Sequence, residues 1–213
     1  MNGVDTTSEC VVCTRLRDVL FDFLAQYQYD LSTDEEVRNR HAELGGFCPL
    51  HTWQYAEMAS PKGVCTAYAE VCRAWSAKLR EGRLGSLHDL PPGPDRCPAC
   101  SLKSFAERVE LERVAAMITA VGQPRPAPPL CLAHVEALGD VISPSLFRRL
   151  LEMQAEVYDE IARNMEEYVK NDNPADRRTL TQEQRVAHRV GLGRMVGHRR
   201  LVTPWEFEKT MGG

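Results

Sequence analysis

With 213 residues, 43% of them apolar, the chain is long enough to bury the core of one large domain or two small ones. A formal net charge of −4 at pH 7 gives no reason to expect nucleic acid or an anionic membrane as the main partner. The first residues lack the basic and apolar stretches of a secretory signal, and no apolar run reaches the length of a membrane span. We therefore expect a soluble protein of the cytoplasm.

Eight cysteines are the most informative feature of the composition. In a reducing compartment they indicate metal binding or thiol redox chemistry rather than structural disulfides. Six of them, with two histidines, form four short motifs that alternate CxxC and CxxH. The motifs are Cys10-Val-Val-Cys13, Cys48-Pro-Leu-His51, Cys97-Pro-Ala-Cys100 and Cys131-Leu-Ala-His134.

Helical signals follow one another through the first part of the chain, residues 1–82. Apolar residues recur at helical spacing from Leu16 to Tyr27, directly after the first CxxC. Asp34-Glu35-Glu36 is typical of a helix N-terminus, where a cap is followed by acidic residues. Gly45-Gly46-Phe47 predicts a tight turn before Cys48, which could aim backbone amides at the cysteine sulfur.

Ser60-Pro61 predicts the start of another helix, because Ser is a good N-cap and Pro suits the first helical position. Its predicted buried stripe comprises Val64, Tyr68, Cys72, Trp75 and Leu79. Cys65 and Cys72 lie seven positions apart on this helix, and we expect both to be small apolar core residues rather than ligands.

Residues 83–95 are rich in Gly and Pro and predict a linker, after which the motifs repeat in residues 96–172. A helix should follow Cys100, with two candidate buried stripes. One comprises Phe105, Val109 and Ala116, and the other Leu111, Val114 and Ile118. Ser143-Pro144 follows His134 by nine residues, as Ser60-Pro61 follows His51. We therefore predict an internal duplication.

The C-terminal tail, residues 173–213, has an excess of basic residues. Thr181 and Gln184 form the pattern of a capping box, which predicts a short helix. Trp205 and Phe207 are expected to pack against an apolar surface. No run of alternating residues indicates a strand. The predicted fold class is therefore all-α, with two pseudo-repeated halves, each built around a metal site of three cysteines and one histidine.

One CxxC and one CxxH together supply four ligands, the usual tetrahedral shell of structural zinc. We expect pairing in sequential order within each half, because only 34 residues separate Cys13 from Cys48 and 30 separate Cys100 from Cys131. The predicted sites are Cys10, Cys13, Cys48 and His51, and then Cys97, Cys100, Cys131 and His134. The alternative is crossed pairing, in which each CxxC shares a site with the CxxH of the other half because the repeats interdigitate. Cations near the ligands could offset the thiolate charge; the candidates are Arg15, Arg17, Arg96 and Lys103.

Other chemistries need other features. Thioredoxin-like redox motifs belong to a βαβ context, which this sequence lacks. Iron–sulfur clusters are usually held by four cysteines. Catalytic zinc needs an open coordination position. His41-Ala-Glu43 and His134-Val-Glu136 match the HxE of zinc deaminases, but no Pro precedes either CxxC as that signature requires.

We therefore predict a non-catalytic protein with two zinc ions, acting as an interaction or regulatory module for another protein. The alternative is an iron–sulfur or thiol-based redox protein that uses the same ligands. Nucleic acid is a further candidate partner, which rests only on the basic tail. No membrane partner is expected.

The order CxxC, Gly46-Phe47-Cys48-Pro-Leu-His51, Cys97-Pro-Ala-Cys100 and Leu130-Cys131-Leu-Ala-His134 resembles a family of uncharacterised bacterial cysteine-rich proteins. The likeness covers most of the chain up to about residue 170. It implies a bacterial, soluble, metal-binding protein and brings no activity or substrate. Val11-Val12 stands inside the first CxxC, where Cys97-Pro98 suggests a proline by analogy.

Overall fold

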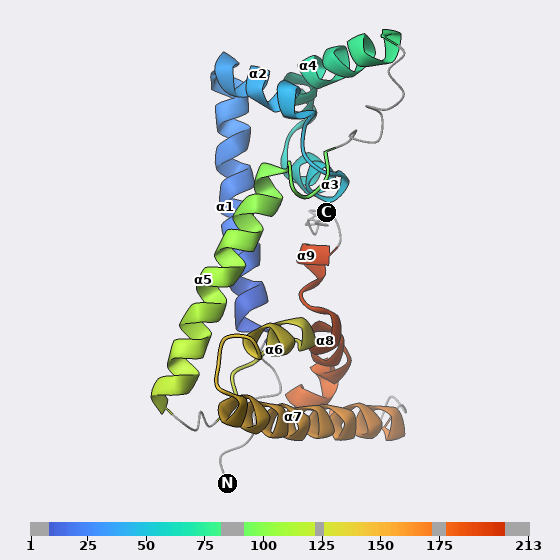
Figure 1. Ribbon diagram of the computed structural model, residues 1–213. Helices are drawn as coiled ribbons and strands as arrows, with labels where there is room; N and C mark the ends of the chain where they lie inside the picture. Colours follow the sequence, from blue (N-terminus) through green and yellow to red (C-terminus); the bar gives the residue numbers. More distant parts are fainter. Residues whose placement is uncertain (1–8, 82–91, 122–125, 172–177, 203–213) are drawn as a thin grey trace. The chain divides into compact units, whose positions relative to one another are not determined.

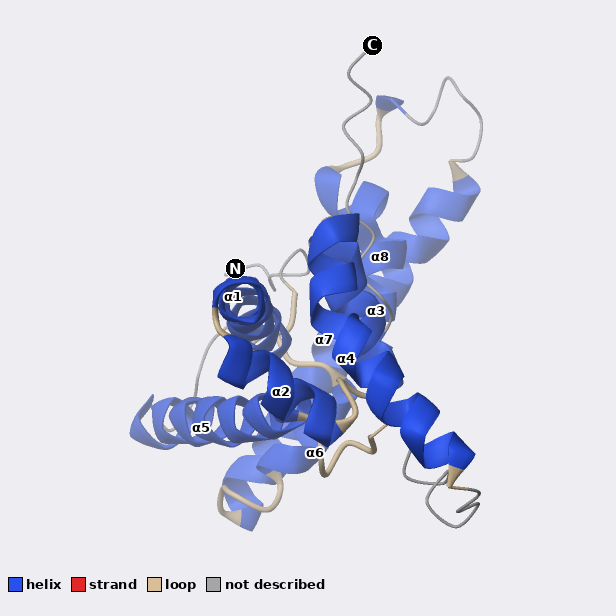
Figure 2. Cartoon of the chain, turned by 90° about the horizontal axis from the view of Figure 1, so that it is seen from above, coloured by secondary structure: helices blue, strands red, loops and turns tan. Residues whose placement is uncertain are grey.

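The computed structural model describes residues 9–81, 92–121, 126–171 and 178–202. All regular structure within these ranges is helical, which confirms the predicted all-α class (Figure 2). In chain order the helices are α1 (Val11–Thr33), α2 (Glu35–Leu44), α3 (Pro49–Met58), α4 (Pro61–Arg80), α5 (Pro98–Val121), α6 (Leu132–Leu138), α7 (Pro144–Lys170), α8 (Gln182–Val196) and α9 (Arg199–Val202) (Figure 1). None of the described helices combines the length and the apolar character needed to cross a membrane.

The helices begin where the capping residues predict. The Ser60 hydroxyl accepts a hydrogen bond from the amide of Gly63 at 3.1 Å, and Ser143 caps α7 in the same way. Thr181 and Gln184 form the predicted reciprocal capping box of α8. Asp34 accepts hydrogen bonds from two amides in the first turn of α2. These side chains satisfy amides that have no partner inside their own helix.

The predicted turn at Gly45-Gly46 is present, but it has a different role. Both glycines have positive φ, 83° and 89°, which only Gly adopts readily. Their amides donate to the carbonyls of Ala42 and His41, so they close the end of α2. The expectation that these amides point at the sulfur of Cys48 was therefore wrong.

The described residues form two compact units. One contains those of Met1–Arg15 and Glu107–Arg199, and the other those of Leu16–Ala106 and Arg200–Gly213. The residues of α1 and α5 are therefore divided between the units. The first turn of α1 belongs with most of α5, and the first turns of α5 belong with most of α1.

The core of the second unit contains a cluster of rings, defined by Phe23, Tyr27, His41, Phe47, Tyr55 and Tyr68. Leu20 and Leu24 of α1 are buried in the same unit, on the stripe predicted for that helix. In the other unit, α7 packs against α8 and α6. It buries Leu150, Gln154, Val157 and Ile161.

The most buried face of α4 differs from the predicted stripe, of which Tyr68 does join the ring cluster. Gly63, Ala67 and Val71 are buried, one position before the predicted stripe, which corresponds to a rotation of about 100°. α4 packs against α2 and α3 in the same unit. The expectation that Cys65 and Cys72 are core residues was wrong, because both are exposed.

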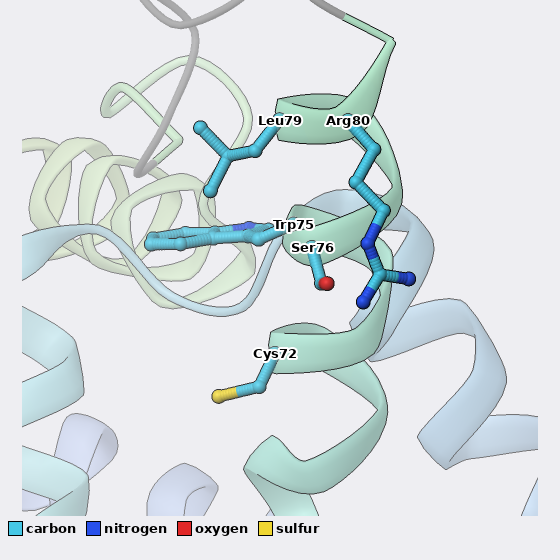
Figure 3. Close-up of a pocket in the computed structure, with 5 residues that line it drawn as sticks. All are labelled: Cys72, Trp75, Ser76, Leu79 and Arg80. Carbon is cyan, nitrogen blue, oxygen red and sulfur yellow. The ribbon is translucent and has the colours of Figure 1, made fainter.

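Figure 3 shows the side of α4 that carries part of the predicted stripe. Cys72, Trp75 and Leu79 project from the same side of the helix. Leu79 is 59% exposed. Of the two stripes predicted for α5, the one with Leu111, Val114 and Ile118 is buried, whereas Phe105 and Val109 are exposed.

Some predictions fall outside the described residues. These are the packing of Trp205 and Phe207 and most of the predicted linker, which lies within residues 83–91. The proposed duplication and its boundaries stay predictions about the sequence.

Candidate metal centres

Two groups of Cys and His side chains come together in the structure, and each contains four residues. Centre 1 consists of Cys10, Cys13, Cys131 and His134, and centre 2 consists of Cys48, His51, Cys97 and Cys100. The ligand atoms in each group lie within 4.8 Å of one another. Seven of the eight residues are buried, and Cys100 is partly exposed. Both groups are compatible with metal binding.

The pairing is crossed, so the expected sequential pairing was wrong. Centre 1 joins the first CxxC to the last CxxH, and centre 2 joins the inner two motifs. Helix length gives the physical reason. α1 has 23 residues and is about 34 Å long, so it carries the chain far from Cys10. The 10-residue α2, about 15 Å long, is too short to bring Cys48 back.

Every ligand lies at the start of a helix. Cys10 and Cys97 directly precede α1 and α5, and the second cysteine of each CxxC lies in the first turn. Cys48 and Cys131 are the N-cap residues of α3 and α6, with the histidine in the first turn. Each centre is therefore built from two helix N-termini. These carry partial positive charge and unpaired amides, which stabilise thiolates.

In centre 1 the Nδ1 atom of His134 faces the three sulfurs. It lies 3.1 Å from the Sγ of Cys131, 3.3 Å from that of Cys10 and 3.5 Å from that of Cys13. The sulfurs of Cys13 and Cys131 are 3.8 Å apart. The other ring nitrogen, Nε2, lies 2.9 Å from a carboxylate oxygen of Glu107 on α5.

Centre 2 has nearly the same inner geometry. The Nδ1 atom of His51 lies 3.1 Å from the sulfur of Cys48, 3.3 Å from that of Cys100 and 3.5 Å from that of Cys97. The sulfurs of Cys48 and Cys100 are 3.7 Å apart. Its outer nitrogen differs from that of His134, because the buried Nε2 of His51 has no hydrogen-bond partner among the described residues.

The pKa values in centre 2 show that one thiol holds the negative charge more readily than the other two. A hydrogen bond with Cys97 lowers the pKa of Cys48. The hydrogen bond with Cys48, together with burial, raises the pKa of Cys97 to about 11. Burial and the neighbouring charge of Cys97 raise the pKa of Cys100 to about 11.

Centre 1 behaves in the same way. Hydrogen bonds with Cys10 and Cys131 raise the pKa of Cys13, and hydrogen bonds with Cys10 and Cys13 lower that of Cys131. Burial opposes the charged form of His134, but hydrogen bonds to Cys10, Cys131 and Glu107 outweigh it and raise its pKa to about 11. Crowded thiols cannot all ionise unless a cation lies among them.

Backbone amides do stabilise the sulfurs, but they come from the starts of helices and from the turn before α9, not from the Gly45-Gly46 turn. The amides of His51 and His134 hydrogen-bond to the cysteines three positions before them. The backbone of His198 does the same for Cys13. The turn before α9 lies close to centre 1, because a Cβ atom on Gly197 would lie 3.6 Å from the sulfur of Cys13.

Of the four cations proposed from the sequence, Lys103 acts on a centre, since its charge lowers the pKa of Cys100. Arg17 pairs with Asp18 at 2.7 Å, and Arg15 and Arg96 are exposed. A cation that the sequence did not suggest is Arg194, which is buried and donates to the carbonyl of Leu130, next to Cys131.

Neither of the two HxE matches places its glutamate in a buried site. Glu43 and Glu136 are exposed. His41 is fully buried in the ring cluster of the second unit.

No protein-family model matches this sequence, no curated protein is similar to it, and no solved structure matches its fold. The case for function therefore rests on the two centres.

Proposed function

We propose that each centre binds one zinc ion and that the protein is a non-catalytic, zinc-stabilised helical module. The observation that carries this proposal is the convergence of three sulfurs and one imidazole nitrogen, twice, within 4.8 Å. This donor set is the one that structural zinc sites use.

The spacing of the ligand atoms supports a single ion in each centre. Zinc–sulfur bonds of about 2.3 Å and a zinc–nitrogen bond of about 2.0 Å place tetrahedral sulfurs about 3.8 Å apart and nitrogen about 3.5 Å from sulfur. One sulfur pair in centre 1 is 3.8 Å apart and one in centre 2 is 3.7 Å apart, and the nitrogen–sulfur distances run from 3.1 to 3.5 Å. An iron–sulfur cluster places several irons and sulfides between its ligands and needs more room.

The completeness of the shells argues against catalysis by the metal. A catalytic zinc keeps one position open for water or substrate. Four protein ligands here fill a tetrahedral shell, and the buried side chains leave the substrate little access. The metal would instead hold helix N-termini together.

We further propose that the partner is another protein, and that the protein works in the cytoplasm, where thiolates stay reduced. Aromatic side chains are enriched at protein interfaces, and Trp53 is 63% exposed. Membership of the bacterial cysteine-rich family suggested by the motifs also stays a proposal.

Anaerobic purification followed by elemental analysis tests the proposal directly. We expect a colourless protein with about two zinc ions per chain. A brown protein with broad absorbance near about 400 nm and bound iron would establish the cluster alternative instead. A protein that binds no metal would contradict both.

Metal removal should then loosen the fold, because metal affinity and folding are coupled in such sites. We expect a strong chelator to lower both the helical circular dichroism signal and the melting temperature. Cys131→Ser should lower the melting temperature in a similar way, and Cys65→Ser, which changes an exposed thiol outside both centres, is the matched control. Unchanged melting after complete metal removal would argue against a structural role.

A further inference from the structure

The two centres differ at the outer nitrogen of their histidine. In centre 1, Nε2 of His134 lies 2.9 Å from Oε1 of Glu107. In centre 2, Nε2 of His51 is buried without a hydrogen-bond partner among the described residues. The inner distances of the two centres match almost one for one, so this difference lies outside the ligand shell.

The difference matters because Nδ1 is the nitrogen that faces the sulfurs in both centres. A neutral imidazole that binds metal through Nδ1 carries its proton on Nε2. In centre 1 this N–H donates to Glu107, which fixes the tautomer and the ring orientation and makes the ligand more basic. In centre 2 the same N–H is buried without an acceptor, which costs free energy when metal is bound.

Three further features distinguish the centres in the same direction. All four ligands of centre 1 are buried, whereas Cys100 of centre 2 is partly exposed. The buried guanidinium of Arg194 donates a hydrogen bond to the carbonyl of Leu130, next to Cys131 of centre 1. The turn at Gly197 also lies close to the sulfurs of Cys13 and Cys131.

We propose that the two centres are inequivalent: Glu107 is a positioning residue that makes centre 1 the tightly held site, and centre 2 is the labile site that releases its metal first. This inference rests on the proposed metal binding. It gives the protein one permanent structural ion and one ion that responds to the supply of metal in its surroundings.

The wild-type protein allows a test that needs no variant. The zinc-loaded chain is titrated with a chelator, alkylated with iodoacetamide at each step and analysed by mass spectrometry. Cys65 and Cys72 are exposed and should react from the start, which gives an internal reference. The cysteines of centre 2 should become reactive next, at about 10–100-fold lower chelator concentration than those of centre 1.

Simultaneous labelling of both centres, or labelling of centre 1 first, would overturn the inequivalence while leaving metal binding intact. A chain that carries no metal before chelation would instead overturn the proposed function. The two failures are therefore distinguishable in one experiment.

Glu107→Gln tests the positioning role. We expect zinc affinity at centre 1 to fall about 10–100-fold with the affinity of centre 2 unchanged, so that the two labelling steps merge. The matched control is Glu112→Gln, an exposed carboxylate on the same helix. Nitrogen-resolved NMR of the loaded protein adds a readout that a purely structural role would not move, since the His134 Nε2–H signal should shift in Glu107→Gln only. Unchanged affinity and an unchanged His134 signal would show that Glu107 has no positioning role.

Discussion

His41 is buried among aromatic rings with both ring nitrogens unpartnered among the described residues. Burial lowers its pKa from 6.5 to about 4. The nearby phenols of Tyr27 and Tyr68 are neutral at these pH values, because burial raises their pKa values further above the ordinary 10. Nothing in the cluster therefore compensates a protonated His41.

The resulting pH dependence has a definite sign. The unfolded chain takes up the His41 proton near pH 6.5 and the folded chain only near pH 4, so stability falls as the pH is lowered between these values. We expect a loss of about 1.4 kcal/mol per pH unit within that window. Denaturant unfolding of the wild type and of His41→Phe at pH 7, 6 and 5 measures it. The difference between the two proteins cancels the pH dependence of metal binding, and a constant difference across this range would contradict the prediction.

Gly46 and Gly193 are expected to respond to Ala in opposite directions. Gly46 has φ +89°, and a Cβ atom there would lie 3.0 Å from a ring carbon of Tyr68, so Gly46→Ala should destabilise the fold by about 1–2 kcal/mol. Gly193 lies inside α8 with nothing within 4 Å of the added atom, so Gly193→Ala should stabilise it by about 1 kcal/mol. Denaturant unfolding of both variants checks the signs. Equal effects would show that local backbone geometry does not decide stability here.

At the scale of the helix, the Ser-Pro starts give a direct test of capping. Ser60→Ala removes the acceptor for the Gly63 amide, and we expect a loss of about 1 kcal/mol, or about 2–4 °C in melting temperature. Ser60→Asp keeps an acceptor at the same position and should melt close to the wild type. A thermal melt of the two variants with zinc present measures the cap alone. If Ser60→Asp loses as much as Ser60→Ala, the hydroxyl does not act as a cap.

The helix starts show how far local sequence carries a prediction. Ser60, Ser143 and Thr181 signal their helices within four residues, and the structure confirms all three. The most buried face of α4 was predicted one position too far along the chain. The prediction chose larger apolar residues, whereas the smaller residues directly before them are the buried ones. Val71 and the small Ala67 are buried, and no local pattern indicates which face of α4 its neighbours will cover.

The centres show the same division at longer range. CxxC and CxxH are local patterns, and they identified all eight Cys and His side chains that the structure brings together in the two groups. Glu107 lies 27 positions from His134, with no spacing rule that joins them, so its contact could not be read from the sequence. The crossed pairing could have been predicted more easily than the Glu107 contact, since a helix as long as α1 already argues against a sequential site.

At the scale of the whole molecule, crossed pairing places all four residues of centre 2 between the two motifs of centre 1 in the sequence. Cys13 and Cys131 are 118 positions apart, whereas His51 and Cys97 are 46 apart. A metal ion bound in either centre would therefore close a longer loop than sequential pairing would, and it would remove more conformational entropy from the unfolded chain. Each centre also takes two of its residues from the chain up to the end of α4 and two from the chain from Cys97 onward, so residues 81–96 connect the two pairs.

A cut in that segment distinguishes the two pairings. A protease site inserted between Gly85 and Ser86 divides the chain into two fragments, each with four of the eight ligands. Because both centres draw on both fragments, we expect the cleaved, zinc-loaded protein to elute as one species in size-exclusion chromatography and to bind about two zinc ions. Chelation should weaken the association of the fragments, since it removes two shared attachments at once. Sequential sites would give the opposite result, with fragments that separate while each keeps about one zinc ion, and that outcome would overturn the crossed arrangement.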